Sequence, residues 1–212
     1  MANKKIRGVY LVTDRPLCLN HSLAEVVRLA ALGGVNLVQL REKETNSREF
    51  LELAKHLKEI LTPFQIPLLI NDRLDICLAA EADGVHLGQS DLPWEDARRI
   101  LGNDSIIGLS LETKEDYQTL IQTDRHPNLD YLAVSPVFDT DTKTNTKPAW
   151  GLEGLGWLRN QTTIPIVAIG GIKESNAKAV VDAGADSLAV VSAICSAKDP
   201  KLATEILSSN FT

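Results

Sequence analysis

The feature that most constrains the fold of this chain is a regular alternation between short apolar runs and longer amphipathic stretches. Eight apolar runs rich in β-branched residues occur, at residues 9–13, 35–40, 66–70, 84–87, 106–109, 131–134, 164–169 and 188–191. Most of them are apolar throughout rather than alternating with polar residues, which is typical of parallel strands buried on both faces. We therefore expect eight parallel strands.

The stretches between these runs have the spacing of helices. In the clearest one, residues 47–61, apolar side chains recur every three or four residues, and Asn46 or Ser47 can cap its start. A second helix is expected at 22–32, because Gly33 and Gly34 form a helix-stop signal after it. The remaining helices are expected at 74–80, 94–101, 114–122, 152–160, 175–183 and 202–208.

Strands and helices in this order predict an α/β fold, a single (β/α)₈ TIM barrel with short loops that spans residues 1–212 as one domain. The alternative, a doubly wound sheet that binds a dinucleotide, is disfavoured because the first strand runs into Thr13-Asp14-Arg15-Pro16 rather than a glycine-rich turn. The one long connection, residues 136–151, is polar and is expected to be a mobile active-site loop.

Composition narrows the partners and the compartment. The chain has 22 Lys and Arg against 28 Asp and Glu, a net charge of −6, so we expect no nucleic acid or membrane partner. No apolar run approaches the length of a membrane span. Cys18, Cys77 and Cys195 are far apart, which favours free thiols and a cytoplasmic location. The sequence leaves the oligomeric state open, a homo-oligomer included, since barrels often associate through their outer helices.

In such barrels, chemistry takes place at the carboxyl ends of the strands, and cationic residues gather at one of them. Gln39, Arg41 and Lys43 are two residues apart, so an extended chain points all three to one side. Arg and Lys there are suited to phosphate oxygens. The alternative is a solvated strand end that pairs its charges through Glu42 and Glu44.

Two carboxylates follow neighbouring strands. Asp72, beside Asn71, and Asp91 are oxygen ligands of the kind that Mg²⁺ prefers together with substrate phosphate and water. The alternative is that Asp91 caps the helix opening at Leu92-Pro93 and Asp72 caps the one that begins near Arg73. No cluster of Cys and His suggests zinc.

The last two strands end in a pattern that favours phosphate. Glycines at 170 and 171 allow backbone N–H groups to approach an anion, and Val191-Ser192 closes the neighbouring strand. His86 lies within a strand and is interpreted as a satisfied core residue, and Ser110 as a hydrogen-bond donor rather than a nucleophile. We assign the tyrosines and tryptophans to packing.

Together these residues resemble the thiamine-phosphate synthase family. The resemblance covers about residues 8 to 195, and its motifs follow the family order. They are Tyr10-Leu-Val-Thr-Asp14, Gln39-Leu-Arg-Glu-Lys43, Asn71-Asp-Arg73, Asp83-Gly-Val-His-Leu-Gly-Gln-Ser-Asp91, Gly108-Leu-Ser110, Thr140-Asp-Thr-Lys143, Ala168-Ile-Gly-Gly-Ile172, and the stretch from Ala185-Asp186 to Ala193-Ile194.

The resemblance implies a Mg²⁺-dependent transferase. Such an enzyme joins the pyrophosphate ester of 4-amino-5-hydroxymethyl-2-methylpyrimidine to 4-methyl-5-(2-phosphooxyethyl)thiazole, or to its carboxylated form, and yields thiamine phosphate and pyrophosphate. The pyrophosphate leaves first, and the thiazole nitrogen then attacks the pyrimidine cation.

The resemblance also implies the site residues. Asp72 and Asp91 would bind Mg²⁺, and Arg41, Lys43, Ser110 and Lys143 would be catalytic. The pyrimidine pyrophosphate would contact Gln39, Arg41, Lys43, Asn71, Ser110 and Lys143. The thiazole phosphate would contact Thr140, Thr142, Gly171, Val191 and Ser192.

The chain departs from the family at Ser135-Pro136, where Gly-Pro is usual, and over residues 141–150. Three alternative functions stay open at this stage. A thiazole tautomerase shares the barrel and the thiazole-phosphate site, but such relatives tend to lose the pyrophosphate and metal residues. A sugar-phosphate isomerase explains the glycines at 170 and 171 but not the Asp72 and Asp91 pair. A non-catalytic ligand-sensing barrel would bind both substrates without releasing pyrophosphate.

Overall fold

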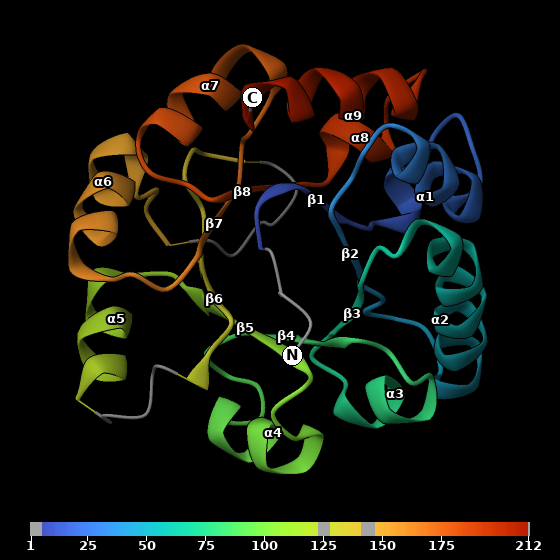
Figure 1. Cartoon of the computed structure of the whole chain (residues 1–212), viewed down its shortest axis with the longest axis horizontal. Coiled ribbons are helices and arrows are strands. Elements are labelled where there is room, and N and C mark those ends of the chain that lie inside the picture. The colour runs from blue at the N-terminus through green and yellow to red at the C-terminus, as the bar shows by residue number, and fades with distance from the viewer. Residues whose placement is uncertain (1–5, 123–127, 141–146, 212) are drawn as a thin grey trace.

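Eight parallel strands close into a barrel in sequence order, each hydrogen-bonded to the next and β8 to β1 (Figure 1). The computed structural model describes residues 6–122, 128–140 and 147–211. The strands are β1 (Gly8–Val12), β2 (Leu37–Leu40), β3 (Leu68–Asn71), β4 (Gly84–Leu87), β5 (Ile106–Leu111), β6 (Tyr131–Val134), β7 (Ile166–Ile169) and β8 (Ser187–Val190). The predicted (β/α)₈ barrel is confirmed.

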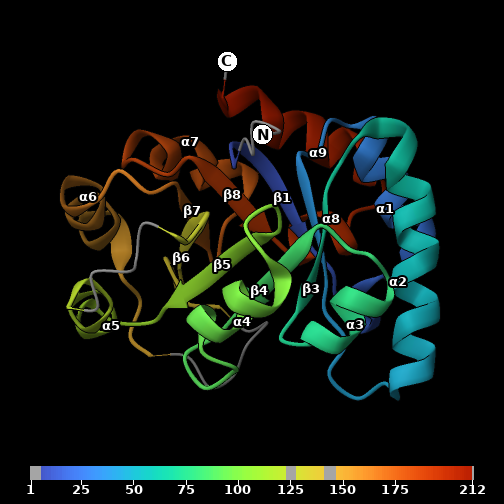
Figure 2. The same ribbon diagram turned by 60° about the horizontal axis from the view of Figure 1, so that its bottom comes forward.

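Helices surround this barrel on the outside (Figure 2). They are α1 (Leu23–Leu32), α2 (Ser47–Leu61), α3 (Leu74–Ala79), α4 (Trp94–Leu101), α5 (Lys114–Ile121), α6 (Gly151–Gln161), α7 (Glu174–Asp182), α8 (Ser192–Cys195) and α9 (Pro200–Ser208). The side chain of Asn46 accepts a hydrogen bond from the Glu49 amide, so it is the predicted cap of α2. Helix α8, four residues directly after β8, was not expected from the sequence, because so short an element carries no periodic pattern.

The core has two layers, one on each face of the barrel wall. Outward-facing strand residues pack against the buried stripes of the helices; in α2 this stripe is Phe50, Ala54, Leu57 and Leu61. A smaller cluster fills the barrel interior and includes Leu37, Leu69, Ile106 and Val167. Burial on both faces explains why the strand sequences are continuous apolar runs.

The amino ends of the strands are joined in pairs by a repeated side-chain contact. One polar residue lies directly before each even-numbered strand, and its side-chain oxygen accepts a hydrogen bond from a backbone amide near the start of the preceding strand. These residues are Asn36, Asp83, Asp130 and Asp186. The distances from these side-chain oxygens to the amide nitrogens are 3.0 Å for Val9, 2.8 Å for Leu68, 2.8 Å for Ile107 and 2.8 Å for Ile166. In return, the backbone N–H of each of the four residues donates to the carbonyl of the same partner. We call these four residues the amino-end clamps.

Two clamps also carry an ion pair. Arg98 from α4 lies 2.7 Å from Asp130, and Arg159 from α6 lies 2.8 Å from Asp186. These arginines also donate to nearby backbone carbonyls, so they tie the helices to the bottom of the barrel.

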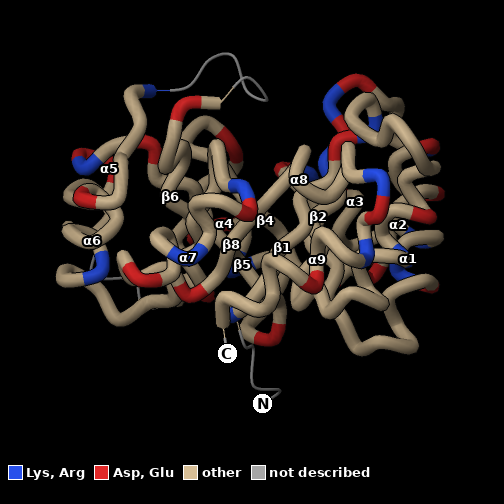
Figure 3. Tube along the Cα trace, turned by 90° about the horizontal axis from the view of Figure 1, so that it is seen from above, with Lys and Arg blue, Asp and Glu red and all other residues tan. Residues whose placement is uncertain are grey.

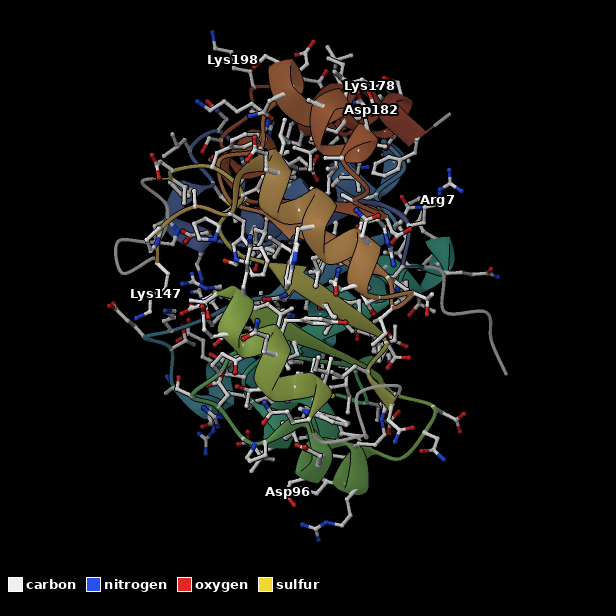
Figure 4. The ribbon with its side chains drawn as sticks, turned by 90° about the vertical axis from the view of Figure 1, so that its left-hand side faces the viewer. Arg7, Asp96, Lys147, Lys178, Asp182 and Lys198 are labelled. Atoms are coloured by element: carbon white, nitrogen blue, oxygen red, sulfur yellow. The ribbon has the colours of Figure 1, made fainter. Side chains whose placement is uncertain are left out.

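The outer surface carries both signs of charge, interspersed along the helices (Figure 3). Lys178 and Asp182, for example, form an ion pair one turn apart on the outer side of α7 (Figure 4). Among the described residues, no helix combines the length and apolarity needed to cross a membrane. Cys18, Cys77 and Cys195 are free thiols.

Substitution of an amino-end clamp residue is expected to lower the stability of the protein without changing the structure at the carboxyl ends of the strands. In Asp83→Ala, the fully buried Leu68 amide loses its acceptor, so we expect the free energy of unfolding to fall by about 1–3 kcal/mol. Urea denaturation measures this change.

Asp83→Asn is the matched variant, because its amide oxygen can still accept the Leu68 hydrogen bond. It should retain most of the stability. An unchanged urea midpoint in Asp83→Ala would show that the clamp is not needed.

Candidate active site

A pocket of about 940 Å³ opens at the carboxyl ends of the strands. Each strand, or the residues directly after it, supplies part of its lining. The predicted site residues found there are Gln39, Arg41, Lys43, Asn71, Asp72, Asp91, Ser110, Thr140, Gly171, Val191 and Ser192. Thr142 and Lys143 lie outside the described residues. The expected mobile loop, residues 136–151, also lies partly outside the described residues, at 141–146.

The cationic side of the pocket is formed by the end of β2. Arg41 is held by its backbone N–H, which donates to Thr13 Oγ1 at 3.1 Å, and by a long 3.4 Å contact from its guanidinium to Asp14. Glu42 instead accepts two hydrogen bonds from Arg15, so it does not serve as the partner of Arg41. The alternative of a strand end paired through Glu42 is therefore wrong for Arg41.

The acidic side is formed by Asp72 after β3 and Asp91 after β4. Their carboxyl groups are hydrogen-bonded to each other, and Asp91 Oδ2 also accepts from the Gly88 amide at 2.7 Å. The capping alternative is wrong, because the N-cap residues of α3 and α4 are Arg73 and Pro93, and neither helix has a side-chain cap. Asp72 has a positive φ of 62°, and its N–H donates to the His86 carbonyl at 3.0 Å. The loop thus holds Asp72 in a backbone conformation that a non-glycine residue seldom adopts.

This contact changes the acidity of Asp72. Burial, together with the hydrogen bond to Asp91 and the negative charge of Asp91, raises the pKa of Asp72 to about 6, while Lys43 acts to lower it. Two carboxyl groups in contact share a proton unless a cation lies between them.

The acidic pair fits a magnesium ion by its chemistry. Mg²⁺ takes few protein carboxylates and fills its octahedron with water and phosphate oxygens. Among the described residues, no three His, Cys, Asp or Glu side chains gather in a way that could hold a metal. A cation held by Asp72 and Asp91 would therefore need further oxygen ligands from substrate or water.

The glycine pair after β7 lies across the pocket. Gly171 has a φ of 65°, and a Cβ there would lie 2.7 Å from the Phe138 Cβ and 2.8 Å from the Asp139 carbonyl oxygen. Only glycine allows so close an approach between this turn and the chain after β6. Val191 and Ser192, at the start of α8, lie in the same wall of the pocket.

Tyr10, Tyr131 and His86 are interpreted from the sequence as packing or core residues, and the structure buries both tyrosines and gives both His86 nitrogens a partner. The sequence did not reveal that their polar atoms form a hydrogen-bonded chain under the pocket, and that Tyr10 and His86 line it. His86 Nε2 lies 2.8 Å from Ser110 Oγ, and Nδ1 lies 2.8 Å from the Tyr131 hydroxyl. The available signal was a tyrosine within a strand buried on both faces, because a buried phenol needs a polar partner.

The connection after β6 is anchored where it leaves and rejoins the barrel. The amides of Trp150 and Gly151 donate to the carbonyls of Pro136 and Val137, and the Trp150 indole donates to the Glu112 carbonyl at 3.0 Å. Thr140 is thereby placed on the pocket wall.

Comparison with known proteins agrees with this geometry. A sequence model of the family described as "Thiamine monophosphate synthase" matches residues 9–194. A thiamine-phosphate synthase of Leptospira biflexa is 72% identical over 207 residues, which cover 98% of this chain and 99% of that protein. One from Albidiferax ferrireducens is 54% identical over 92% of this chain and 87% of that protein.

A solved structure is similar over the same extent. The thiamine phosphate pyrophosphorylase of Pyrococcus furiosus superimposes with a TM-score of 0.86 at 36% identity, over 98% of this chain and 96% of that one. These relatives carry the name of the synthase, so the comparisons do not support the tautomerase alternative.

The acidic pair predicts a titration that NMR can follow. In the metal-free protein, the Asp72 carboxyl should titrate near pH 6, above its ordinary value of 3.8. The pKa of Asp72 is higher in the folded than in the unfolded protein, so its protonation favours the folded state. This contribution to the free energy of unfolding is complete below about pH 4 and is lost as the pH rises through 6. Asp91→Asn removes the neighbouring charge and should lower the pKa of Asp72.

The control is Asp96→Asn on the outer side of α4 (Figure 4), where Asp96 pairs with Arg99. It should leave the Asp72 titration unchanged. Titration of Asp72 near pH 4 in the unsubstituted protein would contradict the contact between the two carboxyl groups.

Proposed function

This chain belongs to the thiamine monophosphate synthase family and is a transferase of that class, and we propose how its pocket carries out the reaction. The substrates are the pyrophosphate ester of 4-amino-5-hydroxymethyl-2-methylpyrimidine and 4-methyl-5-(2-phosphooxyethyl)thiazole or its carboxylated form. The products are thiamine phosphate and pyrophosphate. The observation that carries the proposal is that one pocket holds two sets of anion-binding groups, at Arg41 and Lys43 and at Gly171 and Ser192.

The cationic side takes the pyrophosphate in this proposal. The Arg41 guanidinium binds two phosphate oxygens with its planar fork, and Lys43 adds a compact charge. Asn71 donates a hydrogen bond to the pyrophosphate group, and Ser110 and Gln39, the latter 3% exposed, contact the pyrimidine ring. The resemblance to the family adds Lys143 to this set, beyond the described residues.

Asp72 and Asp91 hold Mg²⁺ in this proposal. When bound, Mg²⁺ would neutralise charge on the pyrophosphate oxygens and so favour their departure. Asp72 has to lose its proton before it can be a ligand, so protons compete with metal binding below about pH 6.

Bond cleavage then needs no protein nucleophile. The bond between the pyrimidine methylene carbon and the pyrophosphate oxygen breaks, and its electron pair leaves with the pyrophosphate. Arg41 and Lys43 stabilise the charge that develops on the leaving group. The pyrimidine ring stabilises the resulting cation until the thiazole nitrogen donates its lone pair to the methylene carbon.

The second substrate is oriented from the opposite wall. Gly171, Val191 and Ser192 approach the thiazole phosphate, and Thr140 adds a hydroxyl from the connection after β6. The resemblance to the family adds Thr142 to this set, beyond the described residues. Holding the thiazole phosphate in the same pocket as Arg41 but on another wall aligns the thiazole nitrogen with the methylene carbon, which lowers the entropic part of the barrier.

The remaining parts of the proposal follow from the same observations. The ligands are two small molecules, with neither nucleic acid nor membrane as partner. Three free thiols fit the reducing cytoplasm. The chain acts as one barrel domain, and a homo-oligomer would pack through its outer helices.

A direct assay tests the function. Purified protein with both substrates and Mg²⁺ should release thiamine phosphate and pyrophosphate in equal amounts, and chelation of Mg²⁺ should abolish turnover. Isomerisation of the thiazole alone would support a tautomerase, and binding of both substrates without pyrophosphate release would support a sensing barrel.

Arg41→Lys tests the phosphate contact. A point charge cannot reproduce a bidentate fork, so we expect kcat/KM for the pyrimidine pyrophosphate to fall on the order of tenfold or more. Steady-state kinetics with the thiazole phosphate at saturation measure this loss.

The matched control is Arg99→Lys. Arg99 is exposed on α4 and forms an ion pair with Asp96, one turn earlier in the same helix. Its kinetics should equal those of the unsubstituted protein. Equal kinetics for Arg41→Lys would remove Arg41 from the proposed binding set.

A further inference from the structure

A chain of buried polar groups crosses the barrel beneath the pocket. Gln39 Nε2 lies 2.5 Å from the Tyr10 hydroxyl, which lies 3.0 Å from the Tyr131 hydroxyl. The Tyr131 hydroxyl lies 2.8 Å from His86 Nδ1, and His86 Nε2 lies 2.8 Å from Ser110 Oγ. Five side chains from five strands are thus connected, and we call them the barrel relay.

The two ends of the relay face the pocket, while its centre is buried. Gln39 and Ser110 line the pocket together with Tyr10 and His86, whereas Tyr131 is fully buried and is not part of the lining. Gln39 comes from β2 and Ser110 from β5, so without the relay the two ends would have no connection through the barrel interior.

The strand register makes room for the relay. His86 is paired with Gly108, and Gly108 is paired with Tyr131. A Cβ on Gly108 would lie 1.9 Å from the Tyr131 ring, so this glycine provides the space in which the ring stacks on His86 at a centroid distance of 5.6 Å. Neither side chain could take this position beside a larger residue at 108.

One assignment of donors lets all the hydrogen bonds of the relay run in one direction, from Gln39 to Ser110. Burial raises the pKa of both phenols, so each keeps the one hydrogen that it can donate. Tyr10 accepts from the Gln39 amide. Either tyrosine hydroxyl can donate to the other, and the roles of the two His86 nitrogens follow from its tautomer. In the order in which Tyr10 donates to Tyr131 and Tyr131 donates to His86 Nδ1, the imidazole carries its proton on Nε2 and donates to Ser110 Oγ.

We propose that the barrel relay sets the hydrogen-bond polarity of the pyrimidine subsite, presenting Gln39 Oε1 as an acceptor at one end and the Ser110 hydroxyl as a donor at the other. Tyr10, Tyr131 and His86 are positioning residues in this scheme, since they act through Gln39 and Ser110. The inference deepens the proposed function and rests on it.

The polarity selects one class of ring. An aminopyrimidine brings an amino donor to Gln39 Oε1 and an acceptor to Ser110. A ring with an oxo group in place of the amino group would place its oxo oxygen next to Gln39 Oε1, and neither atom can donate a hydrogen bond. A site with such a buried mismatch binds the analogue much more weakly.

The first test needs no substitution. In the intact, uniformly ¹⁵N-labelled protein, the two-bond spectrum of the four histidines should show His86 as the Nε2–H tautomer at neutral pH. His86→Gln identifies its signals by their loss. The Nδ1–H tautomer, or a charged imidazole, would overturn the proposed polarity even in a protein that forms thiamine phosphate.

The second test breaks the relay at its centre. Tyr131→Phe removes one hydroxyl, so the KM for the pyrimidine pyrophosphate should rise on the order of tenfold while the KM for the thiazole phosphate stays constant. Inhibition by the oxo analogue of the pyrimidine pyrophosphate should strengthen, because Gln39 and Ser110 are no longer held in one polarity.

Tyr117→Phe is the matched control. Tyr117 is a buried tyrosine of α5 whose hydroxyl donates to the Gln161 carbonyl outside the barrel, at 2.8 Å. Its kinetics should not change. If Tyr131→Phe does not fold, Tyr10→Phe removes the neighbouring hydroxyl, with the same expected split between the two KM values.

Two results would overturn the inference while leaving the proposed function intact. One is an unchanged KM for the pyrimidine pyrophosphate in both tyrosine variants. The other is an equal rise in both KM values, which would show a general loss of packing. Absence of product from the unsubstituted protein would instead contradict the proposed function.

Discussion

Closure of eight parallel strands in sequence order is the constraint on which the rest of the structure depends. Since every strand runs in the same direction, the residues that follow each strand reach one rim, whatever their distance in the sequence. The opposite rim carries the amino-end clamps at Asn36, Asp83, Asp130 and Asp186. The barrel therefore separates the groups that hold it together from the groups that carry its chemistry.

This separation allows an arrangement that would be unstable by itself. Asp72 and Asp91 are in contact at the carboxyl-end rim, close to the cationic residues Arg41 and Lys43. Burial, together with the neighbouring Asp91 carboxyl group, raises the pKa of Asp72, and a divalent cation would relieve the repulsion between the two groups. The same pocket thus brings a pair of carboxyl groups next to cationic side chains, which is the combination that the proposed departure of pyrophosphate requires.

Much of the fold could be predicted from the sequence, because a strand buried on both faces is a continuous apolar run. Strand β4 and helices α2 and α4 occur at their predicted boundaries. Strand β7 begins at Ile166, two residues later than expected, because Ile164 is apolar but its amide donates to the Thr162 side chain in a turn. That residues 1–212 form one domain stays a prediction.

The site was only partly predictable, for a physical reason. Residues near the carboxyl ends of the strands, such as Gln39, Asn71 and Ser110, are placed by topology alone, so their convergence follows from the fold. The hydrogen bonds that join Tyr10, Tyr131 and His86 depend on how side chains meet across the barrel interior. That meeting is set by register and by the space at Gly108, which strand periodicity does not encode.

The measurement that tests the central claim most directly is a crystal structure of this protein with Mn²⁺ and inorganic pyrophosphate, with Mn²⁺ located by its anomalous scattering. The account predicts Mn²⁺ bound to carboxylate oxygens of both Asp72 and Asp91, with the pyrophosphate against Arg41 and Lys43. A metal ion away from the two carboxylates, or a pyrophosphate bound outside this pocket, would contradict it.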